Sequence, residues 1–302
     1  MSQEDDVTLR SIRRRFGPFE RFCLGTAAVL STLFVAASVQ GARRDAEVGE
    51  QLVQRRVELG VGLTERHTSF TKRVAQSTHE LAKSDAADLT SPSALALLQG
   101  GGVYVRVLDS RATSESEVLR ASRESAKDAF ASCLSLGVRD GERETSSCAP
   151  DTGCVGDATS RLVNLRILLA GFAPFQESWS TRAKGASGIE LAVLASELDV
   201  AASGALPRAK KAVDESSFVL IVVDEVPKDT HMTWTDTGLA TVQTMPHDVK
   251  IELLDATTFA PVFRAKMRAD AVPAASASPN GAVLRQVQGC SLGLAVAERI
   301  RG

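Results

Sequence analysis

The apolar stretch FCLGTAAVLSTLFVAASV, residues 22–39, contains no charged side chain and limits where the rest of the chain can work. A helix rises about 1.5 Å per residue, so this stretch would span about 27 Å, close to the roughly 30 Å hydrocarbon layer of a membrane. Arg13, Arg14 and Arg15 precede it, and positive charge holds a flanking segment in the cytoplasm. We therefore expect a cytoplasmic tail over residues 1–21, a transmembrane helix over 22–40 and an exported domain after it.

Two other interpretations of this stretch remain open. Residues 36–38 read AAS, a small-residue site of the kind that a signal peptidase accepts, so residues 22–39 could belong to a cleaved leader. A buried helix in a soluble core is the second alternative. The anchor interpretation makes the lipid bilayer a partner through residues 22–39. It predicts a single-pass inner-membrane protein whose carboxyl-terminal domain lies in the periplasm.

Composition excludes one class of partner. The 302 residues are 44% hydrophobic and 24% charged, with a net charge of −2. This is the mixture of an ordinary globular protein. A protein that neutralises many phosphates needs a basic face, and this balance gives no sign of one. We therefore expect no nucleic-acid partner.

The cysteines give a second indication of export. Cys23 lies in the apolar stretch, which leaves Cys133, Cys148, Cys154 and Cys290. In an oxidising compartment four cysteines can form two disulfides, in three possible pairings. The segment SSCAPDTGCVG is rich in turn-forming residues, so Cys148 and Cys154 could close a short loop. A zinc site fits the spacing less well, and free buried thiols are the alternative if the chain is not exported.

Residues 43–90 form a helical region before the main domain at 91–302. Apolar residues recur at spacings of four and seven between 43 and 84, with charges between them, which predicts an amphipathic helix. The helix either packs on its own domain or forms a stalk through which a homodimer could assemble. Gly60 and Gly62 interrupt the heptads and favour the packed helix.

The remaining pattern predicts an α+β (α/β) fold with a small mixed or antiparallel sheet and a helical middle section over 159–214. Apolar runs and alternation predict strands, and periodic apolar residues predict helices. The strands are expected at 103–108 and 217–226, the hairpin at 249–270, and the helices at 114–136, 159–183, 188–202, 207–214 and 282–300.

The connection over residues 224–248 is the candidate site. It follows a strand, and ligands of open α/β sheets bind at the carboxyl ends of strands. Its candidate ligand-binding residues are Asp224, Glu225, Asp229, His231, Trp234 and His247. Carboxylates beside histidine can hold a metal or transfer protons; the alternative is a solvated loop whose tryptophan packs on the sheet. No metal-ligand or cofactor-binding motif is present, so no cofactor and no catalytic residue is assigned.

The last 85 residues or so resemble the end of small α/β domains of the bacterial envelope. The strand at 217–226 is followed by the hairpin sequence LLDATTFAPVFRAK and a closing helix. This order is similar to that of the TolB amino-terminal domain and of the curli-secretion and penicillin-binding-protein-activator lipoproteins. The resemblance implies a membrane-anchored periplasmic binding or scaffolding protein with an envelope protein as partner. The alternative is a periplasmic enzyme or metal-binding protein that uses residues 224–248.

Overall fold

The computed structural model describes residues 18–85, 87–125, 128–139, 162–227, 238–270 and 281–302. The chain forms two compact units. A helical unit comprises residues 1–58 and 177–196, and a larger unit comprises residues 59–176 and 197–302.

The helical unit is built on helix α2 (Pro18–Leu59), which covers the apolar stretch at its amino-terminal end. Among the described residues no helix is both long enough and apolar enough to cross a membrane, so the predicted transmembrane helix has no support there. Helix α8 (Trp179–Gly185) packs against α2 at Gly49, where a Cβ atom would collide with the Ala183 carbonyl. Helix α9 (Ile189–Val200) follows α8.

The predicted single helix over 43–84 is wrong in its middle. Helix α2 ends at Leu59, and helix α3 begins at Glu65 and ends at Lys83. Gly62 between them has a φ of +83°, a left-handed conformation that favours glycine. Thr64 then starts α3 with a capping box in which His67 takes the place usual for glutamate. The two glycines therefore end one helix and allow another to begin.

The larger unit contains a six-stranded mixed sheet in the order β1-β6-β5-β4-β2-β3. Strands β2, β3 and β4 are parallel, and β4, β5, β6 and β1 pair antiparallel. The strands are β1 (Leu89–Thr90), β2 (Gly101–Leu108), β3 (Leu162–Asn164), β4 (Ser216–Asp224), β5 (His247–Asp255) and β6 (Pro261–Ala269). The predicted mixed sheet, both predicted strands and the hairpin are therefore confirmed, whereas β1 and β3 were not predicted.

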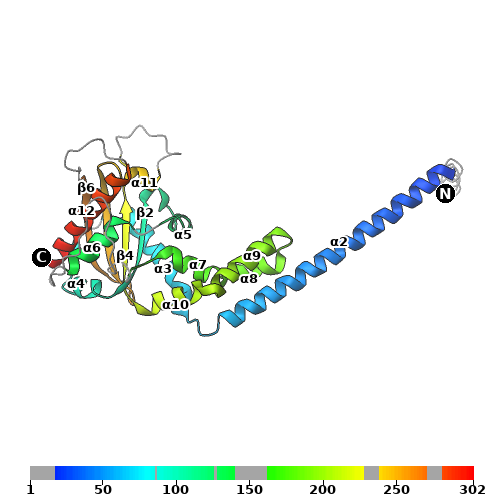
Figure 1. Cartoon of the computed structure of the whole chain (residues 1–302), viewed down its shortest axis with the longest axis horizontal. Helices are drawn as coiled ribbons and strands as arrows, with labels where there is room; N and C mark the ends of the chain where they lie inside the picture. The colour runs from blue at the N-terminus through cyan, green and yellow to red at the C-terminus, as the bar shows by residue number, and fades with distance from the viewer. Residues whose placement is uncertain (1–17, 86, 126–127, 140–161, 228–237, 271–280) are drawn as a thin grey trace, which may run out of the picture. The chain divides into compact units, whose positions relative to one another are not determined.

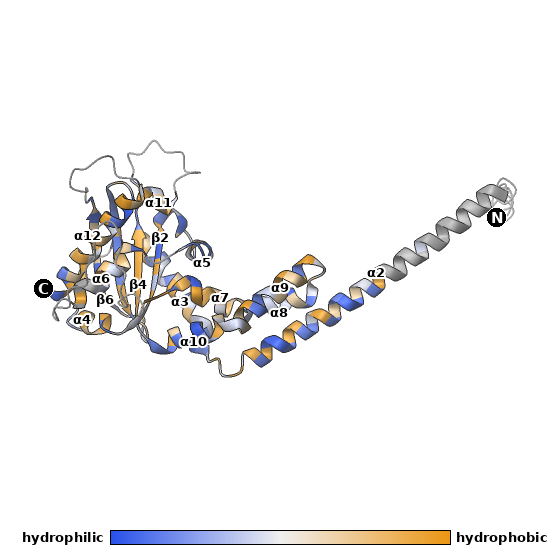
Figure 2. Cartoon of the chain, viewed as in Figure 1, coloured by the Kyte–Doolittle hydropathy of each residue, from blue (hydrophilic) through white to orange (hydrophobic). Residues whose placement is uncertain are grey.

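Helices cover both faces of this sheet (Figure 1). One core cluster joins the sheet to α3, α5 (Glu115–Ser122), α7 (Leu165–Phe172) and α10 (Leu206–Glu215). The other joins it to α4 (Ser93–Leu98), α6 (Ala129–Arg139) and α12 (Gly281–Arg301). Strand β4 is hydrophobic along its length (Figure 2) because it supplies apolar residues to both clusters, as expected for a strand buried on both faces.

Two helix predictions need correction, whereas the two helices predicted at 188–202 and 207–214 are confirmed as α9 and α10. The segment 114–136 is two helices: Ser114 caps α5 as predicted, and α6 begins only after Asp128. The segment 159–183 begins with β3, and Pro174 lies in a 3₁₀ turn, Ala173–Phe175, between α7 and α8. The segments 188–202 and 207–214 are joined by a wide helical turn, Ala201–Ala205, in which Gly204 has a φ of +127°.

A disulfide fixes α6 to α12. Cys133 and Cys290 are bonded at a sequence separation of 157. Gly289 and Gly293 bring the two helices together, because a Cβ on Gly293 would lie 2.6 Å from the Phe130 carbonyl oxygen. The prediction of at least one disulfide is thus met by Cys133 and Cys290. Cys148 and Cys154 lie outside the described residues.

Candidate functional site

The candidate site lies at the carboxyl ends of the parallel strands β2 and β4. The register places Leu108 of β2 beside Asp224, the last residue of β4, and Asp224 beside Val249 of β5. Arg106, two residues before the end of β2, and His247, the first residue of β5, both reach Asp224. The sheet thus brings together three ionisable side chains that are far apart in sequence.

These three side chains form a buried cluster. Arg106 donates from Nε to Asp224 Oδ2 at 2.7 Å and from Nη2 to Oδ1 at 2.6 Å. The Nε2 atom of His247 lies 2.7 Å from Asp224 Oδ1. The side chain of Arg106 is 4% exposed, and those of Asp224 and His247 are 0% exposed. A bidentate pair of this kind is a strong charge-assisted interaction.

A second carboxylate continues the cluster toward the surface. Arg106 Nη1 donates to Asp128 Oδ2 at 2.7 Å, and the Tyr104 hydroxyl donates to Asp128 Oδ1 at 3.0 Å. Asp128 also accepts from the backbone N–H of Ala131 and so caps the start of α6. Its side chain is 25% exposed, which makes it the most accessible acid of the cluster.

Two glutamines tie the chain before β5 to the same cluster. Gln243 lies just after helix α11 (Leu239–Val242). When its side-chain amide oxygen faces Arg106, that oxygen accepts a hydrogen bond from Arg106 Nε at 2.9 Å. The amide of Gln288 in α12 donates to the backbone carbonyls of Gln243 and Met245 at 2.9 and 3.2 Å. The cluster therefore joins β2, β4, β5, the start of α6, the α11 turn and α12.

The electrostatics of the cluster keep its charges fixed. Burial alone would raise the pKa of Asp224, but the Arg106 charge and the hydrogen bonds from Arg106 and His247 outweigh it, so that pKa is lowered. Burial and the Asp128 charge raise the pKa of Tyr104 well above its usual value. The pKa of Arg106 is raised, because the two carboxylates outweigh its desolvation. At neutral pH Asp224 is therefore a carboxylate, Arg106 a cation and Tyr104 a neutral donor.

Glu225 faces the other side of the sheet and belongs to a different group. It lies 3.1 Å from Lys250 Nζ and 2.8 Å from Lys266 Nζ. Burial would raise the pKa of Glu225, but hydrogen bonds from both lysines lower it. Lys250 also donates to the Ala82 carbonyl at the end of α3, at 2.9 Å. Nearby Asp109 accepts from the N–H groups of Ser110 and Val226, and burial raises its pKa.

The structure therefore divides the predicted site. Asp224 and His247 meet, whereas Glu225 lies on the opposite face, and Asp229, His231 and Trp234 lie outside the described residues. Sequence reasoning missed Arg106, Asp128 and Tyr104. The available signal was the lone arginine in the otherwise apolar run VYVRVL, which ends at the same edge of the sheet as Asp224.

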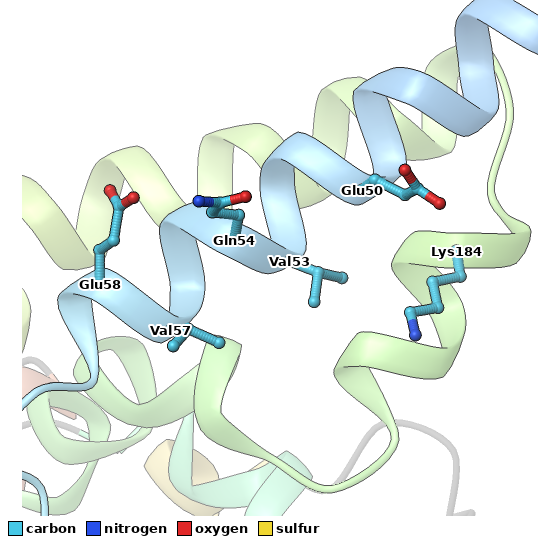
Figure 3. Close-up of a pocket in the computed structure, with 6 residues that line it drawn as sticks. All are labelled: Glu50, Val53, Gln54, Val57, Glu58 and Lys184. Atoms are coloured by element: carbon cyan, nitrogen blue, oxygen red, sulfur yellow. The ribbon is translucent and has the colours of Figure 1, made fainter.

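The helical unit carries a separate surface groove of about 430 Å³ between α2 and α8 (Figure 3). It is lined by Glu50, Val53, Gln54, Val57, Glu58 and Lys184. Val53 lies on the side of α2 that faces Lys184 of α8 (Figure 3). The lining combines two valines with a glutamine and charged residues of both signs.

The fold and the cluster define the larger unit as a three-layer α+β domain with a largely buried ionic cluster at the carboxyl ends of its parallel strands. Among the described residues no group of histidine, cysteine, aspartate and glutamate is placed to hold a metal ion. Comparison of the chain with protein-family models, curated proteins and solved structures found no match.

Proposed function

We propose that this chain is an exported, membrane-tethered protein of the bacterial envelope whose α/β domain binds or scaffolds a partner on the periplasmic side. The proposal joins three parts: export, a tether at the amino terminus and a binding role for the larger unit. Each part rests on a different observation.

The Cys133–Cys290 disulfide carries the export part of the proposal. Both cysteines lie on packed helices, and Cys133 is 3% exposed. Structural disulfides persist in oxidising compartments and are rare in the cytosol of mesophiles. The bridge joins two closely packed helices, α6 and α12. It therefore supports folding in the periplasm.

The tether rests on residues 22–39, which contain no charge and follow an arginine-rich segment. They lie within α2. In the proposed arrangement the chain up to residue 21 stays in the cytoplasm, and the bilayer is the first partner of the protein. Homodimer formation through residues 43–84 would now involve two helices, α2 and α3, rather than one.

The binding role is favoured over an enzyme because of how Asp224 and His247 are used. These two candidates of the 224–248 segment meet in the structure, and both are buried in hydrogen bonds to protein groups. A third candidate, Glu225, is held by Lys250 and Lys266. A metal on His247 would have to displace either Asp224 or the Met245 carbonyl. The choice of an envelope partner rests on the resemblance of the last 85 residues or so to envelope binding domains.

Thiol labelling of the full-length protein in its native cells tests the proposal. Membranes are alkylated before and after reduction, and the intact mass is measured. We expect full-length mass, with Cys133 and Cys290 blocked from alkylation until reduction. A Cys133→Ser variant is the matched control, because it should leave Cys290 without its partner. Alkylation of both cysteines in the folded, unreduced protein would overturn export, and a mass short by the leader would overturn the tether.

A further inference from the structure

The two ring nitrogens of His247 both face hydrogen-bond acceptors. Nδ1 lies 2.7 Å from the Met245 carbonyl oxygen, and Nε2 lies 2.7 Å from Asp224 Oδ1. A carbonyl can only accept, and the Arg106 pair keeps Asp224 a carboxylate that also only accepts. A neutral imidazole has one N–H and can satisfy one of these contacts. Both contacts are satisfied only when both nitrogens carry protons.

The charges around His247 lead to the same conclusion. Strand β2 contributes Arg106 and the neutral Tyr104, β4 contributes Asp224, and Asp128 lies before α6. The α11 turn and α12 contribute carbonyls and the amides of two glutamines. With a protonated histidine the described cluster holds two cations and two carboxylates. A neutral histidine would leave one excess negative charge in a desolvated site, which is costly.

We propose that His247 is a resident cation of the folded protein and that its loss of a proton is a pH-sensitive switch on the segment between α11 and β5. Loss of the Nδ1 proton removes the bond to Met245, and loss of the Nε2 proton removes the bond to Asp224. Either loss loosens the chain that precedes β5 from the sheet. The unit is tightest when the proton is held and loosens as the pH rises.

The sign of the effect follows from proton linkage. In the proposed state the folded protein holds a proton on each ring nitrogen of His247, facing the Met245 carbonyl and Asp224. Where the folded state binds more protons than the unfolded state, stability falls as pH rises. The proposal therefore predicts that the stabilising contribution of His247 declines as the pH rises.

His67 provides an internal comparison. It is also buried, and its Nε2 lies 2.9 Å from a carboxylate, Asp214 Oδ1. Its Nδ1, however, accepts from the backbone N–H of Thr64 at 3.0 Å. That contact requires an unprotonated Nδ1, so His67 is neutral with its proton on Nε2. His247 and His67 both pair with an aspartate through Nε2. They differ in the number of protons they hold because Nδ1 of His247 faces a carbonyl, whereas Nδ1 of His67 faces a backbone N–H.

Nitrogen NMR of the histidine rings in the full-length, ¹⁵N-histidine-labelled protein at pH 7 tests this directly. The chain has four histidines, so single His→Gln variants assign each ring, by elimination if the His247→Gln protein fails to fold. We expect protons on both nitrogens of His247 and on Nε2 alone of His67. An unprotonated nitrogen on His247 at pH 7 would overturn the proposal.

Thermal unfolding of the full chain from pH 6 to pH 9 supplies the second measurement. We expect the melting temperature of the wild type to fall by about 4 °C more than that of His247→Gln, because about 1 kcal/mol corresponds to 2–4 °C in a domain of this size. His67→Gln is the matched control and should keep the wild-type pH slope. Equal slopes for all three proteins would contradict the switch.

Discussion

Asp224 and Glu225 are neighbours in sequence, yet they enter two different electrostatic environments. Asp224 points to the α6–α12 face, where its side chain is 0% exposed and pairs with Arg106 and His247. Glu225 is 21% exposed on the other side, and its partner Lys266 is 50% exposed. The alternation of side chains along the strand, rather than residue type, decides which carboxylate becomes part of the core.

Burial changes the energy that an ion pair contributes. An exposed pair contributes about 0–1 kcal/mol, because water screens it and ordering the side chains costs entropy. Removing one member of a buried pair costs about 3–5 kcal/mol, because the other charge is left without a partner in a desolvated site. The two faces of one sheet edge should therefore respond very differently to similar substitutions.

The largest effect is expected for Arg106→Met. The substitution leaves Asp224 and Asp128 without their shared cation while it keeps a side chain of similar length. We expect a loss of about 3–5 kcal/mol in the free energy of unfolding, measured by urea denaturation. Arg268→Met, whose side chain is 59% exposed beside Asp248, is the matched control. Similar losses for the two variants would remove the distinction between the faces.

Loss of the disulfide should have the next largest effect on stability. The bridge fixes helix α6, and Asp128, which caps the start of α6, belongs to the buried cluster. A Cys133→Ala, Cys290→Ala double variant should lose about 2–5 kcal/mol, since the bridge closes a long loop of the unfolded chain. Unfolding of the oxidised wild type, the reduced wild type and the variant checks this. A reduced wild type as stable as the oxidised protein would contradict the assigned role.

Strong acid should remove the contribution of Asp224 to stability, at a lower pH than that at which ordinary carboxylates are protonated. The lowered pKa of Asp224 means that its stabilising contribution is complete above about pH 4 and is lost as pH falls through the folded-state pKa. In Asp224→Asn this part of the acid dependence should disappear. Unfolding curves from pH 5 to pH 2 for both proteins measure the difference, and parallel curves would show that Asp224 does not carry it.

The smallest effect is expected on the Glu225 face. Glu225→Gln should change the free energy of unfolding by less than about 1 kcal/mol, and added salt should reduce the change further. Lys250 retains its bond to the Ala82 carbonyl in this variant. Urea denaturation at low and high salt is the measurement. A loss as large as that of Arg106→Met would mean that this face is also part of the core.

The sequence was sufficient to predict the strands and helices with strong apolar patterns. Strand β4, the β5–β6 hairpin and α12 lie close to their predicted positions. Strand β3 was missed because three residues are too few to show the alternation of a strand. Its last residue, Asn164, also caps helix α7, so the strand runs directly into a helical pattern. The end of helix α2 at Leu59 depends on the left-handed conformation of Gly62. The spacing of apolar residues continues across this position, so it does not predict the break.

The site was predicted only in part, for a physical reason. Asp224 and His247 were predicted from their place after a strand. Arg106 was missed because VYVRVL reads as a strand with one solvated face, whereas helices cover both of its faces. Asp128 depends on where α6 begins, and that start is set by packing on α12 through Gly293 and the disulfide. Contacts of this kind are tertiary, and no local pattern contains them.

A pair of double-mutant cycles tests the central claim most directly. One cycle combines Arg106→Met with Asp224→Asn, and the other combines Lys266→Met with Glu225→Gln. Urea denaturation gives the coupling energy of each pair. The account predicts a coupling of at least about 2 kcal/mol for the buried pair and less than about 0.5 kcal/mol for the exposed pair. Equal couplings would contradict the claim that one face of this sheet edge holds a buried ionic core and the other a partly exposed group of ion pairs.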